Sequence, residues 1–222
     1  MTTRAMPKPH RDRGIEGRMA KWYASTTLSQ MKEFRALAQQ IGALLPEAGS
    51  VLEVAPGPGY LCIELAKLGR LQVTGLDLSH TMVKIAREKA QQVGAPVHFE
   101  QGSASSLPFP RDSFDLLVCR AAFKNFAHPV RALEEMHRVL KPGGRALIID
   151  LRRDASPATV SREVDRMKLS PVNRAITKLT FRFMPLKSAY TKEHFEQMLA
   201  QTQFSKAEIG GNDLGFEIWL TK

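Results

Sequence analysis

The chain has little cysteine and lacks long apolar runs. Its 222 residues include only Cys62 and Cys119, both inside apolar stretches and neither in a metal-ligand spacing. This pattern indicates reduced, buried thiols and excludes a disulfide scaffold. No apolar stretch approaches the roughly 20 residues that a membrane-spanning helix needs. The first residues, MTTRAMPKPHRDRG, lack the apolar segment of a secretory signal, so we expect a cytoplasmic protein.

The positive charge is concentrated in two segments. The formal net charge is +10, to which residues 1–21 contribute +4 and residues 151–192 contribute +7, while the other residues sum to −1. A surface that binds nucleic acid evenly would spread its cations differently. We therefore expect a mobile basic tail at 1–21 and a single domain at 22–222 with a basic helical insertion at about 152–190.

Short apolar runs alternate with segments of helical period. The runs SVLEVA, LQVTGLDL, VHFEQG, FDLLVCRA and RALIIDL are rich in branched or aromatic residues, which is typical of strands. Between them, TMVKIAREKAQQVG and PVRALEEMHRVLKPGG repeat apolar residues at helical spacing and end at glycine. This alternation predicts an α/β fold with a mainly parallel sheet and helices on both faces. The last segments, KAEIGG and GFEIWLTK, predict an antiparallel hairpin at one edge.

The stretch VLEVAPGPGYL, residues 51–61, ends the first predicted strand with a carboxylate and two glycines. Gly57 and Gly59 allow a tight turn and a close approach of the backbone to a ligand. Open parallel sheets bind ligands at the carboxyl ends of their strands. A nicotinamide site would place a third glycine where Cys62 stands and a helix N-terminus against a pyrophosphate. Because Glu53 would repel a pyrophosphate, the pattern favours a cationic ligand, such as an amino acid ammonium group or a sulfonium.

A second acid ends the next predicted strand. Asp77 lies 18 residues after Gly59, where a carboxylate accepts hydrogen bonds from both hydroxyls of a ribose. The two acids and the glycine loop together describe a nucleoside joined to a cationic amino acid. S-adenosylmethionine fits this description, and we expect it as the cofactor.

The sequence resembles the class I S-adenosylmethionine-dependent methyltransferases, particularly the small-molecule group that includes the ubiquinone and menaquinone biosynthesis type. The resemblance runs from about Val51 to Asp150 and rests on four motifs in order: VLEVAPGPGY, TGLDLSHTMVKIAREKA, LPFPRDSFDLLVC and EEMHRVLKPGG. It implies a Rossmann-like three-layer sandwich with a seven-stranded sheet. It also implies transfer of a methyl group from S-adenosylmethionine to a small molecule.

The resemblance assigns residues to each part of the cofactor. The loop from Glu53 to Gly59 would hold the methionine part, the second strand end the ribose, and the fourth strand end would face the methyl group. The residues in these positions are Glu53, Ala55, Gly57 and Gly59 for the methionine part, Asp77 for the ribose, Leu78, Met82, Ser103 and Ala104 for the adenine, and Cys119 with Arg120 beside the methyl group.

Three residues depart from the family pattern. Ala55 replaces the usual first glycine of the loop. Ser103 stands where the family usually has an aspartate for the adenine amino group, so that contact would pass to a hydroxyl or a backbone group. Lys124 follows the fourth strand where many relatives have a histidine, a change that bears on the substrate.

The sequence offers no evident histidine–acid pair for a general base. Methyl transfer is an in-line displacement that depends largely on positioning, and a base is needed only if the nucleophile must lose a proton. His128 is a candidate base, although its place before Pro129 also suits a helix start. Arg120 and Lys124 favour an acceptor that is already anionic, such as a thiolate, a phenolate or a carboxylate. We predict a small, apolar and anionic acceptor, with Arg120, Lys124 and His128 as catalytic candidates.

The basic insertion contains an amphipathic stretch, LSPVNRAITKLTFRFMPL. Apolar and basic residues repeat on different faces of a helix here; these are Val172, Ile176, Leu179 and Phe183 on one face and Arg174, Lys178 and Arg182 on another. Three interpretations stay open: a lid over the active site, a membrane-surface helix, or a surface for an acidic partner. We favour the lid and place transient contact with an anionic membrane second. Trp22 and Tyr23 are expected to close the other side of the cleft.

Two other functions compete with methyl transfer. A nicotinamide-dependent oxidoreductase is disfavoured by Cys62 and Glu53. A basic module that binds nucleic acid or an anionic membrane would explain the charge without catalysis, and its nucleic-acid affinity would fall steeply with ionic strength. Nucleic acid is not an expected partner, because few aromatic residues stand among the basic ones. The histidines show no ligand spacing, so no metal site is expected.

Overall fold

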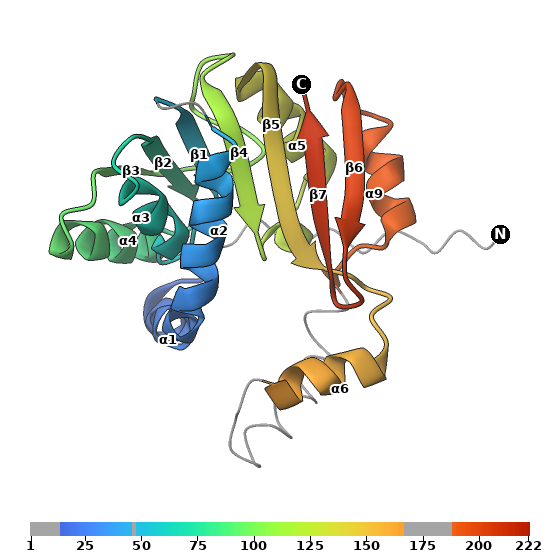
Figure 1. Cartoon of the computed structure of the whole chain (residues 1–222), viewed down its shortest axis with the longest axis horizontal. Helices are drawn as coiled ribbons and strands as arrows, with labels where there is room; N and C mark the ends of the chain where they lie inside the picture. The colour runs from blue at the N-terminus through green and yellow to red at the C-terminus, as the bar shows by residue number, and fades with distance from the viewer. Residues whose placement is uncertain (1–13, 46–47, 167–187) are drawn as a thin grey trace.

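The computed structural model describes residues 14–45, 48–166 and 188–222, which form a seven-stranded sheet with helices on both faces (Figure 1). The strand order is β3-β2-β1-β4-β5-β7-β6; the first five run parallel, and β7 is antiparallel to both of its neighbours. The strands are β1 Ser50–Val54, β2 Gln72–Asp77, β3 Val97–Gln101, β4 Phe114–Arg120, β5 Leu140–Leu151, β6 Lys206–Gly211 and β7 Gly215–Thr221. The predicted α/β class, mainly parallel sheet and antiparallel C-terminal pair are confirmed.

Each face of the sheet has its own apolar core. Along β4, Leu116 and Val118 belong to one core, whereas Leu117 and Cys119 belong to the other. The first core is covered by α2 Met31–Ala43, α3 Tyr60–Ala66 and α4 His80–Gln92, and the second by α5 Pro129–Val139 and α9 Lys192–Leu199. A central parallel strand is buried on both sides, which is why its sequence is an almost continuous apolar run.

The first helix begins nearer the N-terminus than we predicted. Helix α1, Gly17–Thr27, includes residues 17–21 of the predicted mobile tail and leads through η1, Leu28–Gln30, into α2. Its buried side consists of Ala20, Ala24 and Thr27, which repeat at helical spacing. The tail prediction is therefore wrong for residues 17–21, because small residues form the inward face. Residues 1–13 lie outside the described part of the chain.

The insertion after β5 is described in part. Helix α6, Pro157–Arg166, buries Val160 and Val164. The amphipathic stretch 171–187 lies outside the described residues, so the predicted lid remains a prediction. No described helix has both the length and the apolar character that crossing a bilayer requires.

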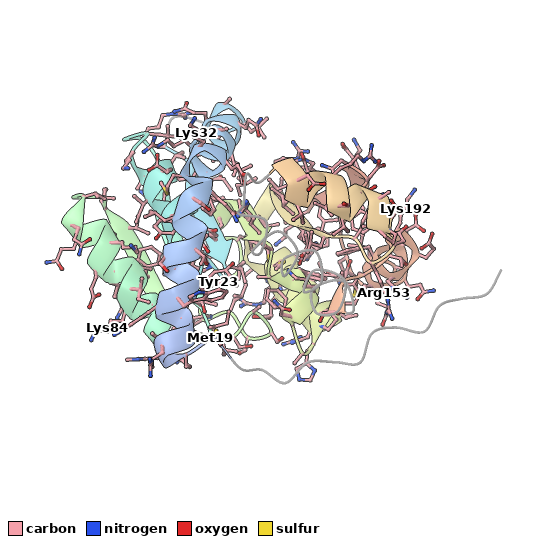
Figure 2. The ribbon with its side chains drawn as sticks, turned by 90° about the horizontal axis from the view of Figure 1, so that it is seen from below. Met19, Tyr23, Lys32, Lys84, Arg153 and Lys192 are labelled. Atoms are coloured by element: carbon pink, nitrogen blue, oxygen red, sulfur yellow. The ribbon has the colours of Figure 1, made fainter. Side chains whose placement is uncertain are left out.

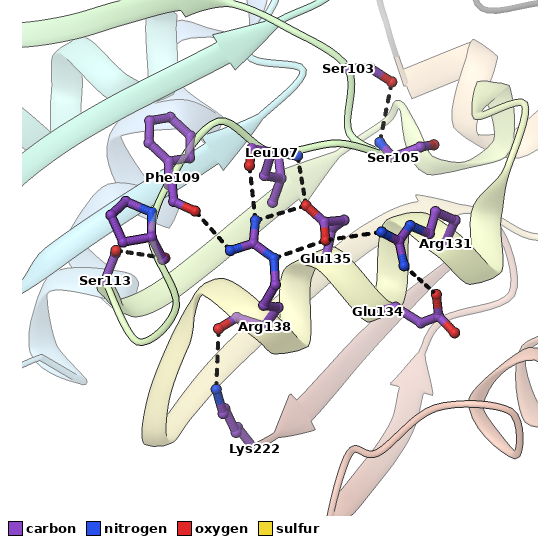
Figure 3. A network of polar contacts seen from close by, with 11 residues as sticks. Ser103, Ser105, Leu107, Phe109, Ser113, Arg131, Glu134, Glu135, Arg138 and Lys222 are labelled. Atoms are coloured by element: carbon purple, nitrogen blue, oxygen red, sulfur yellow. Dashed lines mark hydrogen bonds and ion pairs between the residues drawn. The ribbon is translucent and has the colours of Figure 1, made fainter.

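The loop after β3 is held against α5 by a polar network (Figure 3). Glu135 accepts a hydrogen bond from the backbone N–H of Leu107 at 2.8 Å, and Arg138 donates to the carbonyl oxygens of Leu107 and Phe109 at 2.9 and 2.8 Å. The Arg138 guanidinium also pairs with Glu135 and lowers the pKa of that carboxyl. Ser103 belongs to this loop, so α5 helps to fix the segment that we assigned to the adenine.

Candidate functional site

Two buried carboxylates lie at the carboxyl ends of neighbouring parallel strands. Glu53 is 3% exposed and lies beside Gly75 of β2 and Val118 of β4. Asp77 is also buried and is the last residue of β2. Carboxylates are rarely buried without a functional or pairing reason. The structure therefore brings together the two acids on which the sequence prediction rests.

The loop between β1 and α3 passes through left-handed backbone three times, at Ala55, Gly57 and Gly59, with φ of 58°, 55° and 75°. At Gly59 a side chain is excluded by contact as well, because a Cβ there would lie 2.7 Å from the Phe99 ring. Ala55 adopts the left-handed conformation with its methyl group present, and its N–H donates to the Leu76 carbonyl at 2.7 Å. The loop is thus fixed to β2 in spite of the missing first glycine.

Asp77 holds this loop and the turn that follows β2. One carboxylate oxygen accepts the N–H of Gly57 at 2.9 Å and the other accepts the N–H of Ser79 at 2.8 Å. Burial raises the pKa of the Asp77 carboxyl, and the two backbone N–H groups oppose that rise. Each carboxylate oxygen can accept a second hydrogen bond, so ribose hydroxyls can still bind.

Glu53 accepts a hydrogen bond from the Cys62 thiol at 2.9 Å. Burial raises the pKa of the Glu53 carboxyl to about 7, although the Cys62 thiol and the positive charge of Arg120 oppose the rise. Burial, with Glu53 nearby, raises the pKa of Cys62 well above its usual range, so this thiol stays a donor. No ion pair within the described residues involves Glu53. A cation placed beside Glu53 would stabilise its charged form.

Arg120, at the end of β4, is held by the N-terminal helices. Its Nη2 donates to Gln30 Oε1 at 3.0 Å and to Glu33 Oε2 at 3.1 Å, and the guanidinium lies 4.6 Å from the ring centroid of Phe34. The same charge opposes the rise in the Glu53 pKa. Arg120 therefore connects η1 and α2 with the strand ends, and its contact with an acceptor remains a prediction.

Lys124 forms a buried ion pair with Asp150, near the end of β5. Its Nζ lies 2.8 Å from the Asp150 carboxylate, and the two side chains are 9% and 2% exposed. The Lys124 backbone N–H donates to the other carboxylate oxygen at 2.9 Å. Burial and the Asp150 charge raise the pKa of Tyr190 to about 12. Because the Asp150 carboxylate contacts both the ammonium group and the backbone N–H of Lys124, it compensates the charge of this lysine. Orientation of an anion by Lys124 remains a prediction.

The other candidates differ in how deeply they are buried. Leu78, Ser103 and Ala104 are partly buried, and Met82 and Cys119 are fully buried. Ser103 Oγ accepts the N–H of Ser105 at 3.2 Å and so stabilises its own turn. His128 is exposed before Pro129 at the start of α5, and its imidazole makes no hydrogen bond within the described residues. The His128 carbonyl accepts a hydrogen bond from the Ser105 hydroxyl at 3.4 Å, so the start of α5 lies against the Ser103 turn, and a role for the imidazole remains a prediction.

Helix α1 covers the glycine loop. A Cβ added at Gly57 would lie 3.7 Å from the Tyr23 ring, and the Tyr60 hydroxyl donates to the Ala24 carbonyl at 2.8 Å. Figure 2, which looks at the strands from their carboxyl ends, shows Tyr23 along this helix. Tyr23 is therefore placed to close one side of the site, whereas Trp22 is 61% exposed.

The hydrogen-bond acceptors at this edge fit a nucleoside that carries a cation. Glu53 offers a carboxylate with no ion pair among the described residues, Asp77 offers further acceptor capacity, and Gly57 has no side chain that would obstruct a ligand. Within the described residues, no group of three or more His, Cys, Asp or Glu side chains is placed to hold a metal ion.

Two of the functional contacts were absent from the sequence prediction. The first is the hydrogen bond from Cys62 to Glu53, which connects the two ends of the glycine loop. The sequence prediction considered Cys62 only as the residue that replaces a glycine. The second is the ion pair of Lys124 with Asp150. Asp150 follows an apolar run in the sequence, as Glu53 and Asp77 do, and this position could have indicated a buried acid. Its partner Lys124 lies 26 positions away.

Comparisons with known proteins agree with this geometry. A family described as "Methyltransferase domain" matches residues 52–148. A demethylmenaquinone methyltransferase of Chlorobaculum parvum is 34% identical over 165 residues, which are 72% of this chain and 67% of that protein. One of Deinococcus radiodurans is 39% identical over 115 residues, 51% of this chain and 48% of its own length. The chain thus spans about half the length of the second relative.

Solved structures share the fold at low sequence identity. A Methanococcus maripaludis protein assigned as an S-adenosyl-L-methionine-dependent methyltransferase superposes with a TM-score of 0.74 at 23% identity and covers 96% of each chain. The cyclase SpnF superposes with a TM-score of 0.62 at 17% identity and covers 98% of this chain and 87% of its own. Likeness at these identities shows the fold alone, and the name of SpnF indicates that the fold also serves other chemistry.

Replacing Glu53 with Gln should change how folding stability depends on pH. The native carboxyl binds its proton up to about pH 7, whereas the unfolded carboxyl releases it near 4.5, so wild-type stability falls as the pH rises through this window. Glu53→Gln removes this titration. The free energy of unfolding of the variant, relative to that of the wild type, should therefore rise by up to ~3 kcal/mol between about pH 4.5 and about pH 8. Urea unfolding across this range measures the difference; a difference independent of pH would contradict the raised pKa.

Lys124→Ala should destabilise the fold by about 3 kcal/mol, because Asp150 would remain buried and unpaired. The pair of Lys141 and Asp115 is a matched control, with the same 2.8 Å separation but side chains 41% and 24% exposed. Lys141→Ala should cost less than about 1 kcal/mol. Chemical denaturation of both variants measures the two losses, and equal losses would show that burial of the first pair does not matter.

Proposed function

The chain belongs to the S-adenosylmethionine-dependent methyltransferase family, and on this basis we propose that it methylates a ring carbon of a reduced, quinone-like small molecule. The observation that carries the proposal is the pair of buried acids, Glu53 and Asp77, at the ends of adjacent strands. The acceptor class is supported by the names of relatives, which include demethylmenaquinone methyltransferases and a ubiquinone/menaquinone biosynthesis C-methyltransferase of Marinomonas.

We assign one part of the cofactor to each acid. Glu53 would accept the ammonium group of the methionine part, and Asp77 would accept the ribose hydroxyls while still holding Gly57 and Ser79. Leu78 and Met82 would flank the adenine, with Ser103 beyond its edge. When bound, S-adenosylmethionine supplies a methyl group on a positively charged sulfur.

An anionic acceptor removes the need for a general base in the methyl-transfer step itself. A deprotonated quinol carries negative charge that is shared with its ring carbons, so such a carbon, held in line, would bond to the methyl group as the methyl–sulfur bond breaks. The product would be a neutral dienone, whose ring C–H proton would pass to water while its oxygen takes up a proton, which restores the aromatic quinol. His128, which is exposed before Pro129 at the start of α5, would then have no required role in that step.

Arg120 is the better candidate to orient that anion. Lys124 and Asp150 form a pair with no net charge, whereas Arg120 lies at the end of β4 within electrostatic range of Glu53. A guanidinium has five N–H donors, and the contacts of Arg120 with Gln30 and Glu33 use only Nη2. The remaining donors of Arg120 would face the acceptor oxygen.

The segment after β5 would cover the acceptor. We propose that residues 152–190 act as a lid on the single domain, since α6 follows the carboxyl end of β5 directly and ligands of such sheets bind at that edge.

A transfer assay with radiolabelled S-adenosylmethionine tests the proposal. Demethylated quinols, phenols, thiols and carboxylic acids are offered in parallel, and label should enter the quinol fraction. Asp77→Ala should lose cofactor binding by calorimetry together with transfer, because ribose recognition and the loop both depend on this carboxylate. Asp213→Ala, at a 79% exposed side chain, should keep both. Cofactor binding without any labelled quinol would refute the acceptor class, and absent binding would refute the cofactor.

A further inference from the structure

Helix α1 turns its large apolar residues outward. Among the described residues, six large apolar side chains are exposed, and four of them are Ile15, Met19, Trp22 and Leu28. Met19 and Trp22 lie three positions apart on one face of α1, whereas Ile15 precedes the helix and Leu28 follows it. The side packed on the domain carries small residues instead. A helix that only packs against a core would show the opposite pattern, so the outward face requires its own explanation.

Fixed contacts keep this face outward. The Glu16 carboxylate accepts the backbone N–H groups of His80 and Thr81 at 2.9 and 3.0 Å, and the N–H of Gly17 donates to Thr81 Oγ1 at 3.1 Å. At the other end of the helix, Ala24 accepts the buried hydroxyl of Tyr60. Turning Trp22 inward would break these bonds, so its exposure follows from the way α1 is attached.

Four exposed cations lie on α1 and on the neighbouring helices. Arg18 and Lys21 are exposed on α1, and Lys32 and Lys84 are exposed on α2 and α4. None of these four takes part in an ion pair within the described part of the chain. Figure 2 shows Lys84 and Met19 near the same end of α1 and Lys32 toward the other, in the view from the side where the parallel strands end.

We propose that this α1 face, defined by Met19 and Trp22 with Arg18 and Lys21, docks on an anionic lipid surface. The tryptophan and methionine would enter the interface, where amphipathic rings are favoured. The cations would lie among the negative headgroups. Unpaired cations around an apolar centre complement an extended negative surface, whereas an uncharged protein face would leave them without partners.

The proposed docking surface would bring the site close to a lipid bilayer, but lipid binding does not require that the proposed methyl transfer is correct. It lies at the end of the sheet that carries the glycine loop, so a lipophilic acceptor would leave the bilayer close to the site. Lipid binding by the α1 face can be measured without acceptor or cofactor. The two proposals can therefore fail separately.

Co-sedimentation of the full chain with vesicles tests the surface. Wild type is compared on phosphatidylglycerol–phosphatidylcholine vesicles and on pure phosphatidylcholine, alongside Trp22→Ser and the double variant Arg18→Gln, Lys21→Gln. Leu44→Ser is the matched control, because Leu44 is 53% exposed at the C-terminal end of α2, beside the opening residues of β5. We expect Trp22→Ser and the double variant to bind anionic vesicles roughly tenfold more weakly, with Leu44→Ser unchanged.

Fluorescence gives a second readout that does not depend on affinity. The chain has two tryptophans, and in a Trp219→Phe background the remaining emission belongs to Trp22. That emission should shift to shorter wavelength when anionic vesicles are added. Equal vesicle binding by Trp22→Ser and Leu44→Ser, or an unchanged Trp22 emission, would overturn the proposal. Self-association or RNA binding that Trp22→Ser abolishes, without a change in lipid binding, would assign the face to that partner instead.

Discussion

A buried carboxylate that has no ion-pair partner among the described residues is the constraint on which this site depends. Glu53 lies near the carboxyl end of β1 with a thiol as hydrogen-bond donor, and burial raises its pKa to about 7 although the Arg120 charge opposes the rise. Charging such a group without a partner costs free energy that the rest of the fold must offset. A ligand cation removes that cost, whereas a phosphate would add to it. The burial that penalises the charged form of Glu53 therefore selects for a positively charged ligand.

Asp77 stabilises the loop and would also bind the ligand. Its carboxylate fixes the loop through Gly57 and the turn through Ser79, so the conformation that a nucleoside needs is already formed. The acceptor side is built differently. There, Lys124 and Asp150 cancel each other's charge in the interior, and Arg120 is tied to helices that precede the sheet in sequence. The N-terminal helices thus contribute to the site as well as covering it.

Much of the fold could be predicted because the centre of β4, Leu116 to Cys119, is a continuous apolar run and the helices between strands have clear periodicity. Glu53 and Asp77 could be placed because each lies at or next to the last residue of a predicted strand. The pairs of Cys62 with Glu53 and of Lys124 with Asp150 depend on which loops and strands become neighbours, which periodicity does not encode. Helix α1 was assigned partly to the tail because its inward residues, Ala20 and Ala24, give a weak apolar signal.

A crystal structure of the protein with bound S-adenosylhomocysteine would test the central claim most directly. The account predicts the nucleoside at the carboxyl ends of β1 and β2, with its ribose hydroxyls on the Asp77 carboxylate and its amino group beside Glu53. Density for the nucleoside at another place, or an empty cleft at these strand ends in crystals soaked to saturation, would contradict the account.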